Sequence, residues 1–493
     1  MPTEKQRKDL IERLSTLVPP ESLTDAKELS SGGDHVVPLL KYSPRWKTKQ
    51  VVAAVRALEM INTDKACEAL CEYVVDHRAS VLIQIQKSLK TFSESRALEI
   101  LEFSNSTINK RLKKIATDCV EFQNCFLISK LDHIGDLSNI ETIIFSKCHM
   151  LNDVAGLSNN GPVKSITFFE SQNLQTLNEL GGCSSLESLT LTDCHSLTDI
   201  SGLGKCTALQ DISFDSCKQL AEITGLEDCV NLQSINLTGC KQLSNIADLG
   251  NCASLQIINL SDCEQLSNIA GLGNCTNLLI FRLSNCGKLI KVGNLENCTS
   301  LKSINLAGCP QLTDISELSE CPSLNAINLS GCSHLMDVSM LGKCDSLQSL
   351  DLSDCSHLKD LRGLGSCNTL LTLKVINCSQ LSTVRELSNC ASLQYLDLTD
   401  CGQLNDANGL GSCVSLQILI LSNCDQLTDV SDLGNSSSLK SIDLSGSHQL
   451  AGLGALGNCK SLEFLYISKT IAKKEDIDLL KVNLPKLCIE ITR

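Results

Sequence analysis

Cysteine dominates the chemistry that this sequence offers. The chain of 493 residues contains 29 cysteines, and 25 of them (13 plus 12) fall into two columns with a 23-residue period. The first column, in which serine or threonine stands at three places, is Cys125, Cys148, Ser171, Cys194, Cys217, Cys240, Cys263, Cys286, Cys309, Cys332, Cys355, Cys378, Cys401, Cys424, Ser447 and Thr470. The second column, twelve residues further on, holds Cys183, Cys206, Cys229, Cys252, Cys275, Cys298, Cys321, Cys344, Cys367, Cys390, Cys413 and Cys459. Regularly spaced thiols can pair, bind a metal ion or sense oxidants, so the elements that position them decide which chemistry applies.

The apolar residues keep the same register and predict those elements. One unit reads CxxLxxIxxLxxCxxLxxIxL, and its apolar positions after Cys240 are Leu243, Ile246, Leu249, Cys252, Leu255, Ile258 and Leu260. The last stretch alternates with period two, which predicts a short strand with Ile258 and Leu260 facing inward. The remaining apolar residues recur at every third position, which favours tight turns or 3₁₀ helices. One such coil is too small to fold alone, so we expect the coils to stack, with their strands about 4.8 Å apart in one parallel sheet.

Stacking in this way predicts that the column cysteines are buried thiols. Equivalent Cβ atoms on neighbouring coils lie about 4.8 Å apart, beyond the ~3.8 Å that a disulfide prefers. Parallel thiols do not converge on a metal ion. Serine and threonine fit the column because each keeps a short donor, and redox sensing and metal binding remain as alternatives. Cys67 and Cys71 lie one helical turn apart; a metal clip and core packing are both open for this pair, and packing is favoured. We therefore expect no cofactor and no metal site.

The segments LQSINLTGC (residues 232–240) and LQSLDLSDC (residues 347–355) resemble the LxxLxLxxN/C signature of leucine-rich repeats, and the resemblance covers about residues 117–493. It implies an α/β fold, a right-handed solenoid or horseshoe with a parallel concave sheet that binds another protein. The phrase LxLSxCxxLxDIxxL is also similar to repeats in the sensor regions of intracellular immune receptors. On this basis we assign residues 117–470 to the solenoid of 23-residue units.

The two ends of the chain depart from the repeat. Residues 1–116 have helical patterns over 3–17 and 51–61, and the helix starts at 61–70 and 92–101 echo each other, which resembles HEAT-like repeats. This helical domain is interpreted as a cap for the first coil, a docking module for a second protein, or both. Residues 471–493 are expected to form a C-terminal cap, with a short helix over 475–481 and a last strand over 484–491. In that strand Leu484, Leu487 and Ile489 are expected to replace the inward residues found 22 positions earlier.

Motifs that would support catalysis are missing or misplaced. GLGALG (residues 452–457) matches GxGxxG, but it lies where other coils bend rather than between a strand and a helix. The sequence contains no GxxxxGK[ST] loop and no HExxH motif, so we do not expect an enzyme. An aspartate column follows the first cysteine column by five residues; a solvated acidic stripe is favoured over a calcium site, and its members are Asp153, Asp199, Asp314, Asp337, Asp360, Asp406 and Asp429.

The charge distribution restricts the partners. The net charge is −14, and residues 120–493 alone carry 23 basic and 40 acidic residues, a net −17. So acidic a surface repels nucleic-acid backbones and anionic lipids, so neither is an expected partner. The first residues lack the apolar core of a secretory signal, and no stretch is long enough to span a membrane, which predicts a cytoplasmic protein.

The outward residues of the predicted strands indicate where a protein partner would bind. They are small in the middle coils, but towards the C-terminus they become Lys374, Ile376, Tyr395, Asp397, Ile418, Ile420, Asp443, Phe464 and Tyr466. A smaller group consists of Ile257, Ile280 and Arg282. We expect a non-catalytic scaffold that binds a protein on its concave face, as an adaptor or sensor in signalling or defence. The alternative is a substrate-presenting subunit of an enzyme complex whose catalytic chain docks on the helical domain.

Overall fold

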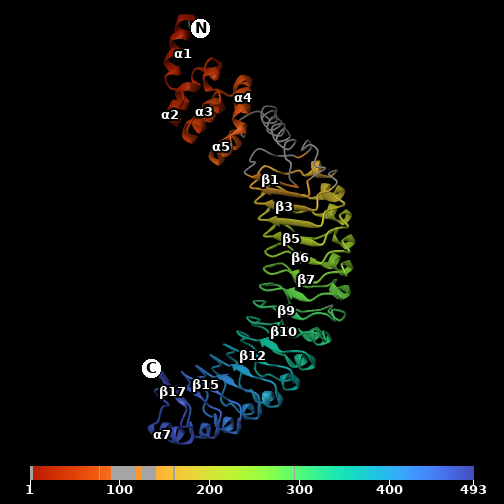
Figure 1. Ribbon diagram of the computed structural model, residues 1–493, viewed down its shortest axis with the longest axis vertical. Coiled ribbons are helices and arrows are strands. Elements are labelled where there is room, and N and C mark those ends of the chain that lie inside the picture. The colour runs from red at the N-terminus through yellow and green to blue at the C-terminus, as the bar shows by residue number, and fades with distance from the viewer. Residues whose placement is uncertain are drawn as a thin grey trace. The chain divides into compact units, whose positions relative to one another are not determined.

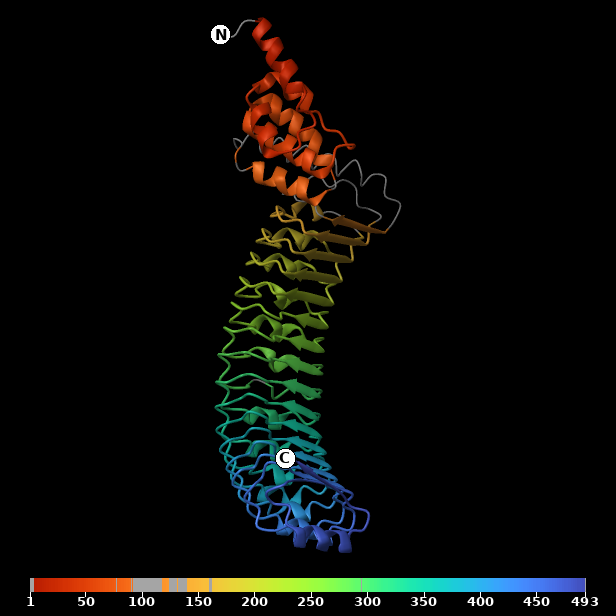
Figure 2. The ribbon, with the colours of Figure 1, turned by 90° about the vertical axis from the view of Figure 1, so that its left-hand side faces the viewer.

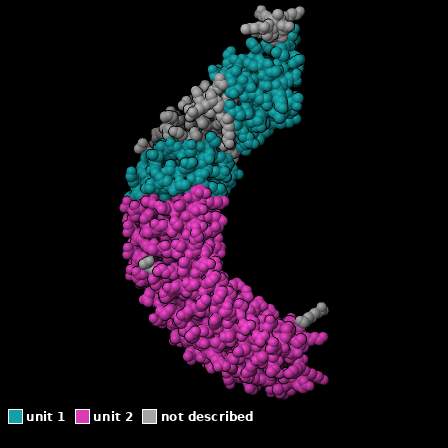
Figure 3. Space-filling view, turned by 180° about the vertical axis from the view of Figure 1, so that it is seen from behind, with its two compact units in different colours: residues 1–209 teal, residues 210–493 magenta. Residues whose placement is uncertain are grey.

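The computed structural model describes residues 4–76, 78–89, 91, 118–123, 131, 140–158, 162–293 and 295–492. Two compact units are distinguished, unit 1 (residues 1–209) and unit 2 (residues 210–493), which Figure 3 shows in different colours. The predicted boundary between residues 116 and 117 lies outside the described residues, so the three domain ranges stay a prediction.

Unit 1 begins with helices, as its sequence pattern predicts. Their bounds are α1 (Glu4–Ser15), α2 (Leu23–Ser30), α3 (Thr48–Ile61), α4 (Asp64–Cys71) and α5 (Ala79–Leu89). Thr63 accepts the Ala66 N–H at 3.3 Å and so caps the start of α4. The helices share a hydrophobic core that includes Leu14, Val55 and Leu70. The second half of the predicted HEAT-like echo, residues 92–101, lies outside the described residues, so this resemblance stays a prediction.

The strands form a single parallel sheet of 17 strands among the described residues. In unit 1 they are β1 (Cys119–Gln123), β2 (Thr142–Ser146), β3 (Ser165–Phe169) and β4 (Ser188–Thr192). In unit 2 they are β5 (Asp211–Asp215), β6 (Ser234–Asn236), β7 (Ile257–Asn259), β8 (Ile280–Arg282), β9 (Ser303–Asn305), β10 (Ala326–Asn328), β11 (Ser349–Asp351), β12 (Thr372–Lys374), β13 (Tyr395–Asp397), β14 (Ile418–Ile420), β15 (Ser441–Leu444), β16 (Phe464–Ser468) and β17 (Cys488–Thr492). Figures 1 and 2 show the strands of unit 2 side by side, with the short 3₁₀ helices on the opposite side of the coils. The predicted solenoid is therefore confirmed.

Each coil is built as the repeat predicts, with its apolar positions turned inward. Ile258 and Leu260 are fully buried, and so is Cys263 at the bend that follows the strand. Neighbouring strands pair exactly one period apart, for example Ile258 with Phe281. The residue before the column cysteine has a positive φ, 62° at Asp262 and 71° at Gly239, which aspartate, asparagine and glycine tolerate best. This left-handed residue turns the chain out of the strand and into the bend.

The C-terminal end contains the predicted helix and strand, but one predicted register is wrong. The helix is α7 (Lys474–Asn483), longer at both ends than expected. β17 pairs Leu465 with Ile489 and Ile467 with Ile491, an offset of 24 residues rather than 22. Leu484 and Leu487 are still buried, but they precede the strand instead of forming it. The insertion of α7 lengthens this last coil, which is why the strand begins later than the repeat pattern suggests.

Close contact between coils makes one glycine hard to replace, which gives a first prediction. A Cβ atom on the buried Gly411 would lie 2.0 Å from the Asp432 carbonyl oxygen of the next coil. Backbone cannot move aside without separating the coils, so Gly411→Ala is expected to destabilise the protein by about 2 kcal/mol or more. Gly402→Ala is the matched control, because a Cβ there meets nothing within 4 Å. Chemical denaturation of both variants measures the difference, and equal stabilities would contradict the tight stacking of the coils.

Candidate functional site

The cysteine columns are ladders of buried thiols that bond one coil to the preceding one. In unit 2 the thiol of Cys240 donates to the Phe214 carbonyl oxygen at 3.2 Å, and the thiol of Cys332 donates to the Leu306 carbonyl oxygen at 3.3 Å. The second column uses the same 26-residue step, as in Cys252 to Leu226 at 3.2 Å. The predicted buried, weakly bonded thiols are confirmed, and the structure adds that the acceptor belongs to the neighbouring coil.

The three non-cysteine members of the first column behave differently from one another. Ser447 is buried and donates to the Leu421 carbonyl oxygen at 2.7 Å, so it replaces a thiol as predicted. Ser171 is also buried, but its hydroxyl has no hydrogen-bond partner among the described residues. Thr470 is exposed and contacts His448 at 2.8 Å, so the prediction that it fits the column is wrong. The chain has already left the repeat at Thr470, which explains its exposure.

Burial also determines the reactivity of these thiols. It raises the pKa of Cys332 to about 12 and that of Cys344 to about 11. A thiol with such a pKa stays protonated at neutral pH, so it is a hydrogen-bond donor and a poor nucleophile. Among the described cysteines only Cys119 and Cys488 are exposed. Thiols whose pKa is raised in this way serve packing and suit neither nucleophilic catalysis nor thiolate ligation at neutral pH.

The other residues whose types could support metal binding or catalysis have structural roles. Each aspartate of the predicted acidic stripe accepts the backbone N–H two residues later, at 2.8–3.2 Å. The bond from the Ser316 N–H lowers the pKa of Asp314, so this carboxylate stays charged and holds its turn. Cys67 and Cys71 pack in the core of the helices. Within the described residues no three His, Cys, Asp or Glu side chains gather as metal ligands would. The glycines of GLGALG run into the 3₁₀ helix Gly454–Asn458 rather than opening an α-helix.

The outward side chains of the sheet in unit 2 form rows that run across the strands. The second row contains the third residue of each strand from β6 to β15, and seven of its members are asparagine or aspartate whose Oδ1 accepts the backbone N–H two residues later, at 2.8–3.2 Å. These caps are Asn236, Asn259, Asn305, Asn328, Asp351, Asp397 and Asp443. The bond fixes the turn that ends the strand. The second row therefore holds the turns that follow the strands, in addition to covering the sheet.

Three strands between β6 and β15 give up this cap. Their second-row residues are Arg282 on β8, Lys374 on β12 and Ile420 on β14, none of which has an acceptor for the turn. Each missing cap forgoes a hydrogen bond with a net value of about 0.5–1.5 kcal/mol. A residue that is worse for local stability than asparagine or aspartate is expected where the surface has another role, such as binding. Within the described part of the chain, the side chains of the two basic residues make no hydrogen bond or ion pair.

The structure places the predicted partner-binding residues on five adjacent strands, β12 to β16. Across these strands Tyr395 pairs with Ile418, Asp397 with Ile420, and Asp443 with Tyr466. Ile418 is 40% exposed and Phe464 is 44% exposed. Two predicted members are less available than expected: Ile376 is half-buried in the turn after β12, and Asp397 is buried. We call five members the apolar patch: Ile418 and Phe464, which are exposed, and Tyr395, Ile420 and Tyr466, which are half-buried.

Asp397 is buried because its neighbours use both of its oxygens. The Tyr395 hydroxyl donates to Oδ2 at 3.1 Å, and Thr399 donates from its backbone N–H and its hydroxyl to Oδ1, at 3.0 and 2.6 Å. Burial and the Asp397 carboxylate raise the pKa of Tyr395, so the hydroxyl stays a donor at neutral pH. Asp397 thus holds the Tyr395 ring in place on the sheet, which makes the tyrosine a rigid, preformed contact.

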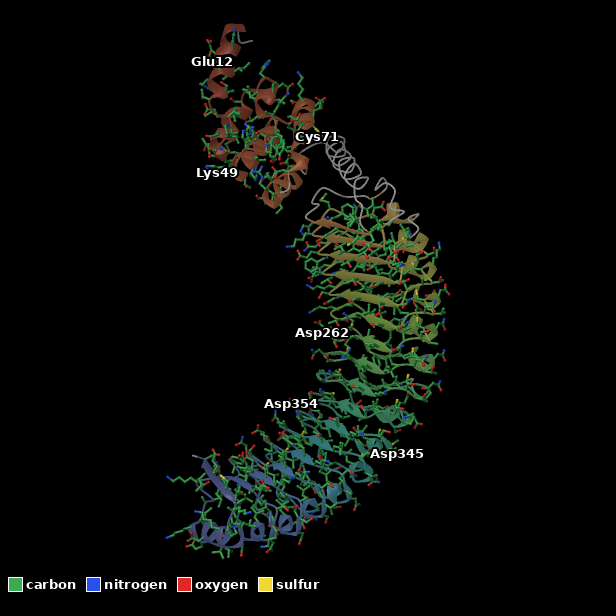
Figure 4. All side chains as sticks on the ribbon, viewed as in Figure 1. Glu12, Lys49, Cys71, Asp262, Asp345 and Asp354 are labelled. Atoms are coloured by element: carbon green, nitrogen blue, oxygen red, sulfur yellow. The ribbon has the colours of Figure 1, made fainter. Side chains whose placement is uncertain are left out.

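A shallow concavity of about 350 Å³ lies beside the apolar patch on the same sheet. Arg282 and Ile280 line it at one end and Lys374 at the other, with small residues between them on β9 to β11. Figure 4 labels Asp354 on this strand side of unit 2 and Asp345 on the opposite side of the coils. The apolar patch and the concavity together form a continuous outward surface over β8 to β16.

Comparison with known proteins places the chain in a family. A family model described as the BspA type leucine-rich repeat region matches residues 73–198, 156–267, 184–316, 272–405 and 367–476. The chain belongs to this leucine-rich repeat family. The resemblance inferred from LQSINLTGC and LQSLDLSDC is thereby confirmed. A search of curated protein sequences finds no match.

Solved leucine-rich repeat structures resemble parts of this chain. An internalin (InlF) from Listeria monocytogenes is 20% identical with a TM-score of 0.48, and the likeness covers 60% of this chain and 83% of the internalin. The functional domain of InlJ from the same species, which includes a cysteine ladder, is 16% identical with a TM-score of 0.41 over 66% of this chain and 71% of that one. A leucine-rich repeat protein of Leptospira interrogans is 13% identical with a TM-score of 0.38, over 78% and 98% respectively.

None of the helices among the described residues of this leucine-rich repeat chain combines the length and the apolar character that crossing a membrane requires.

Sequence reasoning found the apolar patch and the group around Arg282, but it missed the turn caps. The signal was present, because asparagine or aspartate recurs 23 residues apart at Asn236 and Asn259 and again from Asn305 to Asp351. Against that background the side chains of Arg282, Lys374 and Ile420 stand out as the departures.

Proposed function

We propose that this leucine-rich repeat protein is a non-catalytic recognition scaffold that binds a protein partner on the sheet face of unit 2. The partner contacts are the residues that sequence analysis singled out on β12 to β16, with Asp397 as support for Tyr395. Adaptor or sensor roles in signalling or defence, in the cytoplasm, belong to the same proposal. The net −17 charge of residues 120–493 supports a protein rather than a nucleic acid or an anionic membrane as the partner.

One observation carries this proposal: large apolar side chains stand on the outward face of β13, β14 and β16, whereas β9 to β11 present only small or polar ones. Ile418 and Phe464 are 40% and 44% exposed, whereas β9 and β10 present only Ser303, Ala326 and asparagines in the same rows. Exposed apolar groups cost free energy in water, and burying them against a partner recovers about 25 cal/mol per Å². Aromatic residues held in one rotamer are typical energetic centres of protein interfaces.

The double substitution Tyr395→Asp with Ile420→Asp tests the proposal. It places two carboxylates in the apolar patch beside Asp443, so we expect partner capture to fall at least 100-fold, consistent with the 2 kcal/mol or more that each interface centre contributes. Both side chains face outward, so the variant should still fold, but the loss of the Tyr395 hydroxyl from the buried Asp397 carboxylate should lower its unfolding temperature. The measurement is affinity capture from lysate under reducing conditions, with quantitative mass spectrometry of the captured proteins.

A matched control keeps this test specific. Ser234→Asp with Asn259→Asp uses the same two rows on β6 and β7, where Asn259→Asp retains the turn cap. This control adds the same charge to the same sheet, seven coils away from the apolar patch. It should capture the partner like the original protein. If the patch variant captures the same proteins in the same amounts, the assignment of the binding face is wrong.

A further inference from the structure

We propose that the sheet face of unit 2 binds an extended polypeptide segment in which one carboxylate contacts Arg282 and one apolar side chain, about eight residues away, contacts Tyr395 and Ile420. This inference rests on the proposed function and deepens it, because it states the chemistry and the spacing of what is bound. It combines three observations: the missing turn caps, the charge environment of Arg282, and the concavity that connects it to the apolar patch.

The charge environment distinguishes Arg282 from the other basic residue of the surface. Arg282 is exposed, and its in-register neighbours are the neutral Asn259 and Asn305. Lys374, by contrast, lies in register between Asp351 and Asp397, which offset its charge. Arg282 is therefore the cation on this face without a neighbouring carboxylate in its row. A guanidinium in this setting binds a carboxylate well, because it offers two parallel N–H donors.

The concavity between the two anchors suits a main chain rather than a bulky side chain. Its floor on β9 to β11 carries Ser303, Ala326 and Ser349 in the first row, so a backbone can approach the sheet closely. Asn305 and Asn328 use their Oδ1 atoms for the turn caps, which leaves each amide NH₂ as a donor. Peptide carbonyl groups that cross the strands supply matching acceptors. The surface thus offers a cation, then neutral donors, then apolar side chains.

Strand spacing sets the length of the segment. From Arg282 on β8 to Ile420 on β14 there are six strand intervals, about 29 Å at ~4.8 Å each. An extended chain advances about 3.4 Å per residue, so roughly eight residues span this distance. Side chains an even number of residues apart point to the same side of an extended chain, so positions i and i+8 both face the sheet. The expected segment therefore carries Glu or Asp at one position and Leu, Ile or Phe eight residues from it.

Defined peptides test this inference on the full chain. The probes are fluorescein-labelled 13-residue peptides of serine, alanine and threonine with Glu at position 3 and Leu at position 11, and the same pair in reverse order. We expect fluorescence anisotropy to show binding of at least one order, about tenfold weaker when Glu becomes Gln or Leu becomes Ser. Shortening the gap by three residues should weaken binding similarly. Equal affinity for the Glu, Gln and Lys peptides would overturn the inference.

Reversing the charge at position 282 tests whether Arg282 is the residue that contacts the peptide carboxylate. Arg282→Glu should lose the Glu peptide and prefer the peptide that carries Lys instead. Lys343→Glu, an exposed site on the opposite side of the coils, should retain the original preference. If both variants lose the Glu peptide equally, the contact with Arg282 is wrong. If no peptide binds to the original protein while the apolar patch still captures a protein, the extended segment is overturned and the proposed function stands.

A variant that restores the turn caps distinguishes the effect of these side chains on peptide binding from their effect on stability. Arg282→Asn with Ile420→Asn supplies the acceptor that the other coils have, so the unfolding temperature should rise by about 2–4 °C. The same variant should lose the peptide. A protein that becomes more stable while it loses its ligand shows that the original side chains are present for binding. A lower unfolding temperature, or unchanged peptide affinity, would contradict this account of the missing caps.

Discussion

Raising the pH from 8 to 10 is expected to unfold unit 2, because the thiol ladders hold their protons far more tightly in the folded chain than in the unfolded one. Burial raises the pKa of fifteen thiols of this unit to about 11 or about 12. An exposed thiol ionises near pH 8.5. Between these values the unfolded state binds fewer protons than the folded state, so the free energy of unfolding decreases as the pH rises.

The expected effect is large because the ladders are long. Each thiol lowers the free energy of unfolding by about 1.4 kcal/mol for each pH unit above its unfolded pKa. At pH 10, about 1.5 units above the unfolded pKa, fifteen thiols together remove on the order of 30 kcal/mol, more than the 5–15 kcal/mol that stabilises an ordinary domain. Below about pH 7 this contribution is fully present, so the protein should show constant stability there, and the free energy of unfolding should begin to fall between pH 7 and 8.

Guanidinium denaturation followed by circular dichroism, with a non-thiol reductant present, measures this dependence at half-unit intervals from pH 7 to 10. Cys332→Ser is the control, since Ser447 shows that a hydroxyl fits the ladder and a hydroxyl does not ionise in this range. This variant should reduce the slope at pH 10 by about 1.4 kcal/mol per pH unit. A free energy of unfolding that does not change between pH 8 and 10 would show that the thiols are not buried as described.

Replacing Phe145 by alanine is expected to destabilise unit 1 by about 3–5 kcal/mol, the usual cost of removing a buried ring. Phe145 is fully buried and stacks between Phe122 and Phe168, with ring centroids 4.9 and 5.0 Å apart. The substitution leaves a cavity and removes two aromatic contacts, each worth about 0.5–1.5 kcal/mol. Because the Phe145 ring contacts the coils on both sides of its own, its loss weakens the packing among all three coils.

Phe145→Leu is the matched control, because Leu191 fills the equivalent position two coils later. It keeps a buried aliphatic group, so we expect it to cost about 1.5 kcal/mol or less. Thermal and chemical denaturation of the two variants give the difference directly. If alanine and leucine at position 145 were equally stable, the stacked rings would contribute nothing to the coils of unit 1.

Much of the solenoid could be predicted from the sequence, because its signals repeat. Ile258, Leu260 and Cys263 recur with one period, and each turns inward as their spacing requires. Stacking then fixes the neighbours, so the parallel sheet follows from the repeat alone. The final strand could not be placed in this way. α7 interrupts the period, and the register of Ile489 with Leu465 depends on how that helix packs.

The surface was harder to predict than the core, for a physical reason. The alternation of apolar and polar residues in a strand predicts which side chains point outward. It does not predict which of these side chains already have a hydrogen-bond partner within the chain. Asp397 was expected to contact a partner protein, whereas it is buried beneath the Tyr395 and Thr399 donors. The asparagines of the second row point outward as well, and only the structure shows that they hold the turns. Only the hydrogen bonds separate the residues that build the sheet from Arg282, Lys374 and Ile420, which do not cap it.

The proposed function depends on the partner lying on the strand side of unit 2, and site-specific photo-crosslinking tests this most directly. A benzophenone amino acid is placed either at Ile418, on the sheet and 40% exposed, or at Val414, in the bend of the same coil and 62% exposed. The account predicts that, after capture and irradiation, the partner is crosslinked from position 418 and not from position 414. Crosslinking from position 414 alone, or equally from both, would contradict it.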